Sequence, residues 1–430
     1  MKNAGILTIG NEILQGYTVD SNSNHISKEL TIRDINVTIQ LTVPDVISKI
    51  KEKIDKFIIK DYDYIFITGG LGPTHDDVTK KALLSLFDCK LFFLKDRHNK
   101  LEKKFNKQIP ESQSEILEIS KSIENDIGTA LGMYINFKKS KIVVLPGVPS
   151  EMKQMLNSYF IANKLLPNQT KNILTFNTFG IYETRLSDKM KNIINNYKNK
   201  VYFSFLPSYE GVRLRIKILE NSDININSLK DEIMNLLGNY IYSCDDVRIE
   251  EVILNLLIKN NLTLSLAESC TGGFISKSIT DISGASNYFV GSLVAYSNDI
   301  KSNFLDIPSA TIEKYGAVSS QVSELMAINI SKNFKSDIAL SCTGISGPNG
   351  GTDKKPVGTV YISIKFLDKL VTEKFIFRLN RKSHRMISKQ TALYMLWKLL
   401  INLKYWFISF PEICIFYNQL NNLFKVLKKD

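Results

Sequence analysis

The segment ESCTGG at residues 268–273 places a hydroxyl, a thiol and two glycines next to one another. Before it, leucines alternate with polar residues over 262–266, which is typical of a half-buried strand. After it, apolar residues recur at helical spacing from Phe274 to Ile282. The segment is therefore predicted to be a loop between a strand and a helix, with Glu268 as its first residue. Its glycines permit tight turns, and free N–H donors at the helix start attract phosphate or a developing oxyanion.

Hydrolysis of a carboxamide needs a nucleophile, a base that takes its proton and donors for the oxyanion. Ser269 is the candidate nucleophile in this loop. Lys301 is the candidate base, since it follows the predicted strand 293–296 by one turn and a buried lysine can be partly neutral near pH 7. The alternatives are that Ser269 caps the following helix and that Lys301 is an ordinary solvated lysine.

Two further residues bear on this interpretation. Cys270 is the rival nucleophile, but no imidazole is evident nearby to take its proton. His384 is the only histidine after residue 98, and it lies in a charged helical stretch, which leaves no clear place for a Ser-His-Asp arrangement.

A second glycine-rich loop, SCTGISGPNGG at 341–351, follows a predicted strand over 338–340. Its backbone N–H groups and Thr343 suit a phosphate, a ribose or an oxyanion. Lys355 or Arg381 could pair with a substrate phosphate, and a solvated surface position is an equally good interpretation of each.

Taken in order, the segments 264–286, 291–305, 338–364 and 380–385 resemble the C-terminal domain of the CinA family. The resemblance continues upstream and covers almost everything to about residue 400. It implies a cytoplasmic deamidase without cofactor that converts nicotinamide mononucleotide to nicotinate mononucleotide and ammonia in pyridine nucleotide salvage, and it implies a homodimer. It assigns Ser269 as nucleophile and Lys301 as general base.

The same resemblance implies supporting groups around this pair. Tyr296, Thr343 and backbone amides near Gly272 and Gly344 would orient the serine or stabilise the oxyanion. The residues expected to bind the substrate are Thr271, Gly272, Gly273, Gly344, Gly347, Lys355 and Arg381.

The segment TGGLGPTHDD at 68–77 follows a predicted strand and precedes a predicted helix. Its glycines bring the backbone near a ligand, and two adjacent carboxylates could hold a divalent cation that bridges diphosphate oxygens. The alternative is that these carboxylates only favour the helix dipole. The predicted nucleotide site comprises Gly69, Gly70, Gly72, Thr74, Asp76 and Asp77, with Asp76 and Asp77 as metal ligands.

This segment, together with 10–16, 19–23 and 146–151, resembles the molybdopterin-binding-like domain of the family. That domain is associated with metal-dependent ADP-ribose pyrophosphatase activity, which makes ADP-ribose a second candidate substrate. Asn11 stands where the family usually has an aspartate, and this puts the second activity in question. His75 is expected to be solvated.

Strand and helix patterns alternate over about the first 160 residues and predict a mostly parallel sheet with helices on both faces. Ligands then bind at the carboxyl ends of the strands. The lysine-rich segment 96–125 is expected to contain a helix with exposed faces. The predicted strands are 6–9, 37–43, 64–68 and 142–145, and the predicted helices are 24–32, 46–59 and 78–87.

Residues 172–243 differ, because two adjacent strands, 201–206 and 212–218, are flanked by two helical patterns. The resemblance implies a KH-like α+β module, but the G-x-x-G loop of nucleic-acid-binding KH modules is missing. The expected fold is α/β, with two α/β domains joined by this module. The expected boundaries are 1–168, 172–245 and 247–404, with a tail of unknown role at 405–430.

The 430 residues carry a net charge of +12, which could indicate nucleic acid, a membrane face or phosphorylated metabolites as partners. Basic residues are spread along the chain, so nucleic acid is not expected. A competence-linked binding protein remains a third hypothesis, based on the family name and this charge. The five cysteines lack C-x-x-C spacing, which argues against zinc and disulfides and fits a reducing cytoplasm. Lysines interrupt the apolar stretch 393–410, so a buried terminal helix is predicted instead of a membrane span.

Overall fold

The structure is a computed structural model that describes residues 2–74, 77–167, 173–219 and 222–403. The chain divides into two compact units, residues 1–170 and 171–430. Helices cover a main sheet in the first unit, and the second unit contains two separate sheets. The predicted α/β fold class is therefore confirmed. The predicted tail, 405–430, lies outside the described residues.

The main sheet of the first unit has the strand order β2-β1-β3-β8-β7-β6. Its first four strands are parallel, as predicted, and the other two are antiparallel. The sequence patterns did not predict β6 and β7. The strands are β1 (Lys2–Ile9), β2 (Ile35–Val43), β3 (Tyr64–Thr68), β6 (Ser120–Ile123), β7 (Gly132–Phe137) and β8 (Ser140–Leu145).

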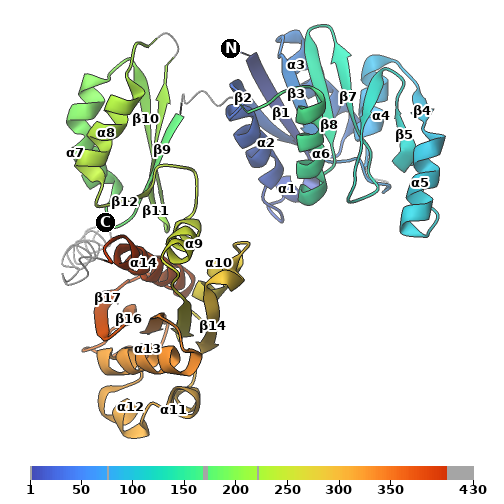
Figure 1. The fold of residues 1–430 in the computed structure, drawn as a ribbon. Coiled ribbons are helices and arrows are strands. Elements are labelled where there is room, and N and C mark those ends of the chain that lie inside the picture. Colours follow the sequence, from blue (N-terminus) through green and yellow to red (C-terminus); the bar gives the residue numbers. More distant parts are fainter. Residues whose placement is uncertain (1, 75–76, 168–172, 220–221, 404–430) are drawn as a thin grey trace. The chain divides into compact units, whose positions relative to one another are not determined.

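Helices cover both faces of this sheet (Figure 1). Apolar side chains of the helices and strands are buried between them. One face carries α2 (Ser21–Thr31) and α6 (Pro149–Ala162), and the other carries α3 (Ile47–Ile59) and α4 (Thr79–Phe87). The lysine-rich segment contains α5, most of whose side chains are exposed, as predicted. The remaining elements of this unit are α1 (Asn11–Leu14), β4 (Leu91–Phe93), α5 (Lys95–Phe105), η1 (Glu111–Ser114) and β5 (Glu115–Leu117).

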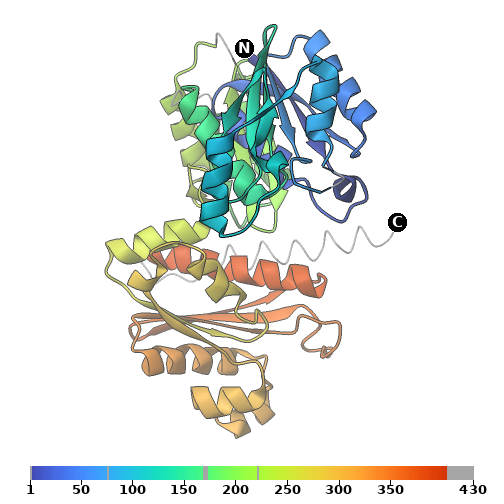
Figure 2. The same cartoon turned by 90° about the vertical axis from the view of Figure 1, so that its right-hand side faces the viewer.

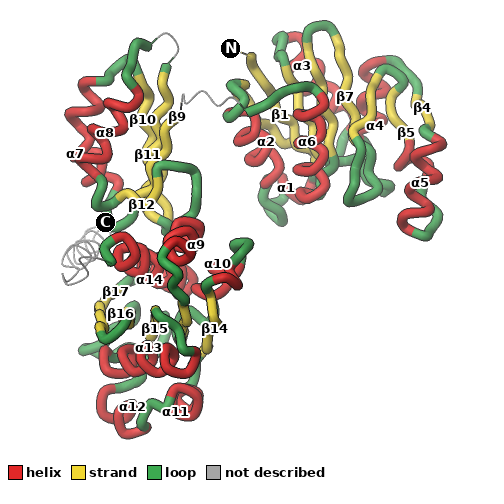
Figure 3. The backbone as a smooth tube through the Cα atoms, viewed as in Figure 1, coloured by secondary structure: helices red, strands yellow, loops and turns green. Residues whose placement is uncertain are grey.

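The first sheet of the second unit is antiparallel, in the order β10-β11-β9-β12. Both predicted strands and both predicted helices of this module are present, and the helices lie on one face of the sheet (Figure 3). The elements are β9 (Ile173–Thr178), α7 (Glu183–Asn196), β10 (Val201–Ser208), β11 (Gly211–Ile218), α8 (Ile226–Leu237) and β12 (Ile241–Ser243).

The second sheet of this unit has the order β14-β13-β15-β16-β17. The first three strands are parallel, so their carboxyl ends meet at one edge, and the last two are antiparallel. The strands are β13 (Leu264–Glu268), β14 (Phe289–Val294), β15 (Ile338–Gly344), β16 (Thr359–Phe366) and β17 (Lys369–Ile376).

Two groups of helices enclose this sheet (Figure 2). One face packs against α9 (Ile249–Lys259), α10 (Phe274–Thr280) and α14 (Arg381–Ile401), with the short η2 (Ala285–Asn287) beside them. The other packs against α11 (Asn298–Leu305), α12 (Ser309–Tyr315) and α13 (Ser320–Phe334). The predicted buried terminal helix is α14, most of whose side chains are buried. Among the described residues, no helix combines the length and the apolar character that crossing a bilayer requires.

Candidate active site

Ser269 is the first residue after β13, at the edge where the parallel strands end. Its backbone N–H donates to the carbonyl oxygen of Cys342 on β15, 2.9 Å away, which extends the contact between the two strands by one residue. The N-cap of α10 is Gly273, and no side chain caps that helix. The alternative that Ser269 is a helix cap is therefore wrong.

Glu268 is not a loop residue, as the sequence predicted, but the last residue of β13, and its side chain is fully buried. Its carboxylate accepts hydrogen bonds from the backbone N–H groups of Ile275 (3.1 Å) and Ser276 (2.8 Å), and from the Ser276 hydroxyl. The first donors of α10 are thus occupied, so the predicted anion site at that helix start is wrong. All of β13 is buried, not half-buried, because helices cover both sheet faces.

Lys301 lies on α11 with only 1% of its surface exposed, so it is not a solvated lysine. Its Nζ lies 3.1 Å from Ser269 Oγ and donates to the carbonyl oxygens of Ala295 (2.7 Å) and Tyr296 (3.4 Å). Burial lowers the pKa of Lys301 to about 8, and the nearby Cys270 opposes this effect. The structure therefore brings together the two residues that the sequence predicted to react, with an amine that loses its proton readily.

A cavity of about 170 Å³ opens beside this pair, at the carboxyl ends of the three parallel strands. Its lining carries two cationic groups, and no Asp or Glu is among the described residues that line it. Asn298 and Ser346 were not predicted as site residues, although they lie within the segments 291–305 and 341–351. The lining residues are Ser269, Cys270, Tyr296, Asn298, Lys301, Ala317, Val318, Thr343, Gly344, Ser346 and Arg381.

Thr343 lines the cavity, but its hydroxyl donates to the carbonyl oxygen of Ala317, 2.9 Å away. Since a carbonyl only accepts, this proton is not free to stabilise an oxyanion, contrary to one of the two predicted roles. The hydroxyl of Tyr296 accepts a hydrogen bond from Arg381 (2.6 Å). The contact of Tyr296 with Lys301 is made by its backbone carbonyl.

Cys270 also lines the cavity, and its Sγ lies 3.6 Å from Cys342 Sγ. The hydrogen bond with the Cys270 thiol, together with burial, raises the pKa of Cys342 well above its ordinary value. A Cβ on Gly344 would lie 3.0 Å from Cys270 Sγ and 2.8 Å from Thr359 O, so this close packing requires glycine. The Lys301 amine lies against the serine hydroxyl, which favours Ser269 over Cys270 as nucleophile.

The predicted substrate-binding residues fall into three groups, one of which, Gly347 and Lys355, is not part of the cavity lining. Gly344 and Arg381 line the cavity. Thr271, Gly272 and Gly273 instead form the turn into α10, where the Gly272 N–H donates to the Ser269 carbonyl oxygen (3.1 Å).

Three basic side chains of this domain each donate a hydrogen bond to a backbone carbonyl oxygen. The side chain of Arg385, which sequence analysis did not select, donates to the carbonyl oxygen of Thr271 (2.6 Å). Arg381 donates to the carbonyl oxygen of Gly347 (2.9 Å), and Lys355 Nζ donates to that of Tyr315.

His384 is on α14, as predicted, but it is fully buried and contacts Ser346, not Ser269. Its Nδ1 lies 2.9 Å from Ser346 Oγ, and its Nε2 lies 3.1 Å from the carbonyl oxygen of Gly358. Burial lowers the pKa of His384 to about 4.

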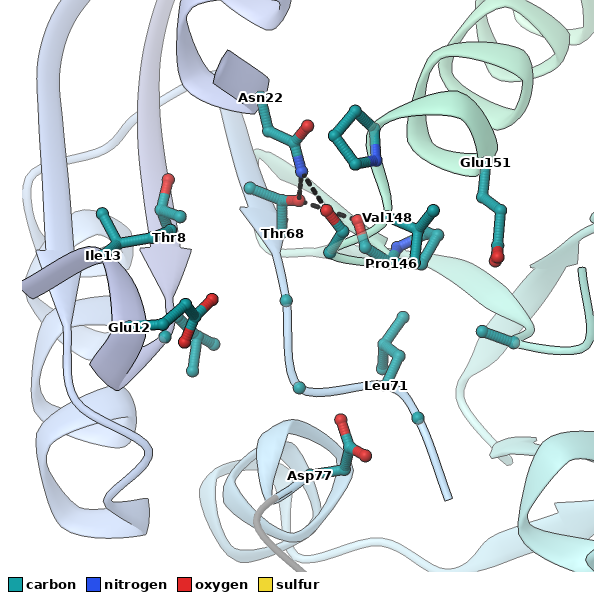
Figure 4. A pocket seen from close by; sticks show the side chains of 18 of the residues that line it. Thr8, Glu12, Ile13, Asn22, Thr68, Leu71, Asp77, Pro146, Val148 and Glu151 are labelled. Carbon is teal, nitrogen blue, oxygen red and sulfur yellow. Dashed lines mark hydrogen bonds between the residues drawn. The ribbon is translucent and has the colours of Figure 1, made fainter. Parts of the chain in front are cut away.

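The N-terminal unit has a cavity of about 430 Å³ at the carboxyl ends of β1, β3 and β8 (Figure 4). The predicted residues Gly69, Gly70, Gly72 and Asp77 line it. Gly69 has φ +107°, and a Cβ there would lie 2.1 Å from Ile9 O, so only glycine fits this approach. Figure 4 shows how the Asn22 side chain crosses to Thr68: its Nδ2 donates to Thr68 Oγ1 (3.0 Å) and to Gly147 O (2.8 Å).

The predicted metal ligand Asp76, like His75, lies outside the described residues. Asp77 Oδ2 accepts from the backbone N–H (2.9 Å) and hydroxyl (2.6 Å) of Thr74, and α4 begins only at Thr79. Over the described ranges, no group of three or more His, Cys, Asp or Glu residues is arranged to hold a metal ion. The predicted metal site at Asp76 and Asp77 therefore stays a prediction. Asn11 is exposed, and its backbone N–H donates to Asp45 Oδ2 (2.8 Å).

Three protein-family models match the chain in succession. Residues 5–165 match the family described as "Probable molybdopterin binding domain", 174–243 the "Damage-inducible protein CinA KH domain", and 246–400 the "CinA C-terminal domain".

Similar proteins match the chain over nearly its full length. A CinA-like protein of Pseudothermotoga lettingae is 34% identical over 409 residues, covering 94% of this chain and all of the relative. A CinA-like protein of Dictyoglomus thermophilum is 36% identical over 408 residues, covering 93% of this chain and 99% of the relative. The crystal structure of the protein CinA from Thermoplasma acidophilum is 31% identical, covers 38% of this chain and 98% of its own, and gives a TM-score of 0.36.

Proposed function

The chain belongs to the CinA family, and from this premise we propose that its C-terminal domain hydrolyses the carboxamide of nicotinamide mononucleotide to nicotinate mononucleotide and ammonia. The observation that carries the proposal is the 3.1 Å approach of the buried Lys301 Nζ to Ser269 Oγ beside a cavity. Serine and lysine are a known nucleophile and base pair for acyl transfer.

Acylation begins with a neutral Lys301. With a pKa of about 8, about one lysine in ten is neutral at pH 7. The neutral amine takes the hydroxyl proton of Ser269, and Ser269 Oγ attacks the carboxamide carbon to form a tetrahedral intermediate. The ammonium that this transfer creates lies beside the developing oxyanion and stabilises it electrostatically.

The intermediate collapses when the carbon–nitrogen bond breaks and Lys301 returns its proton to the departing nitrogen, which leaves as ammonia. Ser269 is then an ester of the nicotinate carboxyl group. Lys301, neutral again, takes a proton from a water molecule that attacks this ester. Breakage of the carbon–Oγ bond releases the carboxylic acid, which loses its proton to water, and restores the Ser269 hydroxyl with the proton from Lys301.

Arg381 is the group that we assign to the phosphate of the nucleotide. Its side chain is exposed at the cavity, and contacts with Gly347 O and the Tyr296 hydroxyl fix its position. A guanidinium held in this way pairs well with phosphate oxygens. Lys355, held against Tyr315 O, is the second cation proposed for this role.

The decisive experiment is incubation of the purified chain with nicotinamide mononucleotide, with free nicotinamide as the matched control that lacks ribose and phosphate. Chromatography of the nucleotides and an enzymatic ammonia assay should show equimolar nicotinate mononucleotide and ammonia from the first substrate and much less turnover of the second. A chain that releases no ammonia from the nucleotide would contradict the proposed activity.

A second candidate function is hydrolysis of ADP-ribose in the N-terminal unit. The favouring observation is the 430 Å³ cavity at the ends of three parallel strands, with glycine backbone on one side. Of the two carboxylates that would hold the metal, Asp77 lines this cavity and Asp76 lies outside the described residues. Release of AMP from ADP-ribose with added Mg²⁺ or Mn²⁺, abolished by a chelator, would support this function. If no AMP is released with either metal, hydrolysis of ADP-ribose by this unit is contradicted.

A further inference from the structure

Ser346 is a cavity residue that the proposed reaction does not use. It follows β15 by two residues, and only 6% of its surface is exposed. It lines the same cavity as Ser269 and Lys301. Its hydroxyl contacts the imidazole of His384, which is fully buried on α14.

The partners of His384 determine which atom carries the proton. The carbonyl oxygen of Gly358, 3.1 Å from Nε2, can only accept, so Nε2 must be the protonated nitrogen. A neutral imidazole has one N–H, so Nδ1 is an acceptor and the Ser346 hydroxyl donates to it over 2.9 Å. Burial lowers the pKa of His384 to about 4, so the ring stays neutral near pH 7.

With its only proton committed to His384, Ser346 can offer a ligand nothing but lone pairs. Thr343, on the same segment, is in an equivalent state because its proton is committed to Ala317 O. Both residues line the cavity. This wall therefore contains two hydroxyl oxygens that can accept hydrogen bonds and cannot donate them.

The charged groups of the cavity, in contrast to these two hydroxyl oxygens, favour a negatively charged ligand. Lys301 and Arg381 line it, without an acidic side chain among the described lining residues. By charge alone, such a cavity binds the negatively charged carboxylate product more tightly than the neutral amide substrate. A carboxylate has only acceptor oxygens, whereas a carboxamide nitrogen carries two hydrogens that need acceptors.

We propose that Ser346, with Thr343 as a second acceptor, binds the carboxamide nitrogen of the substrate and thereby makes the cavity favour the amide over the acid. This proposal rests on the proposed function, whose substrate and product differ at that one group. Ser346 is then a specificity-determining residue: the amide donates to its lone pairs, while a carboxylate oxygen in the same place meets lone pairs and is repelled. The product is released more easily for the same reason.

The test measures binding without turnover, by titration calorimetry on the full chain carrying Ser269→Ala. Affinities for nicotinamide mononucleotide and nicotinate mononucleotide are compared with and without a second change, Ser346→Ala. We expect Ser346→Ala to weaken amide binding by ~3–10-fold, the range for one lost neutral hydrogen bond, while acid binding stays the same or tightens. An equal change for both ligands, or no change, would overturn the proposal.

A second variant separates this role from a purely structural one. His384→Leu keeps the Ser346 hydroxyl but removes its acceptor, so the freed proton can donate to a carboxylate. Acid binding should therefore tighten by ~3–10-fold in this variant, which a mere loss of packing cannot produce. If His384→Leu does not fold, the Ser346→Ala comparison alone decides.

The proposed activity and the role of Ser346 are contradicted by different results. If the wild-type chain releases no ammonia but the Ser269→Ala chain prefers the amide in a Ser346-dependent manner, the proposed function fails and the assignment of Ser346 survives. If ammonia is released and the preference does not depend on Ser346, only the assignment of Ser346 fails. Binding of neither nucleotide would overturn both.

Discussion

The carboxylate of Glu268 accepts a hydrogen bond from the backbone N–H of Ser276, 2.8 Å away, across the turn that carries Ser269. One end of this contact is the last residue of β13, and the other is in the first turn of α10. The five-residue turn between strand and helix is therefore closed by a hydrogen bond to a fully buried carboxylate, which holds the predicted nucleophile in place.

Glu268→Ala should lower both stability and activity. It leaves the buried N–H group of Ile275 and the partly buried N–H group of Ser276 without their acceptor, which costs ~1–3 kcal/mol in unfolding free energy for the unpaired buried donor. Thermal unfolding of the second unit checks the stability change, and kcat for ammonia release checks the position of Ser269. The matched control is Ser276→Ala, which removes one hydroxyl donor and keeps both backbone contacts. Equal stability of Glu268→Ala and wild type would show that the contact contributes nothing.

The chemistry of Ser269 and Lys301 is tested by changing each side chain. Ser269→Ala removes the nucleophile and should reduce kcat by at least ~10³-fold. Lys301→Arg keeps a cation next to Ser269 Oγ, but guanidinium does not lose its proton, so the loss should be ~10²–10⁴-fold, as for removal of a general base. The control is Lys332→Arg at an exposed position on α13, which should keep full activity. Wild-type rates in Lys301→Arg would exclude the lysine as base.

Some of this arrangement could be predicted from the sequence. The run Tyr64–Thr68 has apolar residues typical of a buried strand, and β3 has these bounds. The glycines and the hydrophobic periodicity predicted that Ser269 lies between a strand and a helix. Its predicted partner Lys301 does lie next to it, with 3.1 Å between Nζ and Oγ.

Other features depend on tertiary contacts that no local pattern contains. Glu268 was predicted in a loop because the alternation of leucines ends before it, and its burial in β13 depends on the donors of α10. Ser346 and His384 are 38 residues apart, and each looks like an ordinary polar residue by itself. Strand β6 was missed because its sequence, SKSI, is short and mostly polar.

The pH dependence of the reaction follows from the lowered pKa of Lys301. Below pH 8 the neutral fraction rises tenfold per unit, so kcat/KM should rise with unit slope from pH 6 and level off above about pH 8. The control Cys270→Ala removes the group that raises this pKa, so its plateau should begin at slightly lower pH with activity retained. Loss of activity in Cys270→Ala with an unchanged chain fold would instead identify the thiol as nucleophile.

The lowered pKa of Lys301 also predicts how the stability of the second unit changes with pH. The pKa of Lys301 is about 8 in the folded chain and 10.5 for an ordinary lysine, so between these values the unfolded chain binds more protons. Stability of the second unit should therefore rise with pH from about 8 to 10.5, and the group contributes no pH dependence below that window. Lys301→Met should remove this part of the slope in urea unfolding followed across pH 7–10, measured against wild type. An identical slope in the two proteins would contradict the lowered pKa.

Gly69→Ala tests whether the N-terminal cavity depends on the close approach of two strand ends. A Cβ at Gly69 would lie 2.1 Å from Ile9 O at a positive φ, so the backbone must move, at a cost of ~2–4 kcal/mol for strain in a buried site. Gly16→Ala is the matched control, because Gly16 also has a positive φ (+78°) but nothing lies within 4 Å of its Cβ position; only the conformational cost of ~1 kcal/mol remains. Thermal unfolding of both variants should therefore show a clearly larger loss for Gly69→Ala. If ADP-ribose is cleaved at this cavity, AMP release should fall with Gly69→Ala and persist with Gly16→Ala, whereas ammonia release from the C-terminal domain should be the same in both.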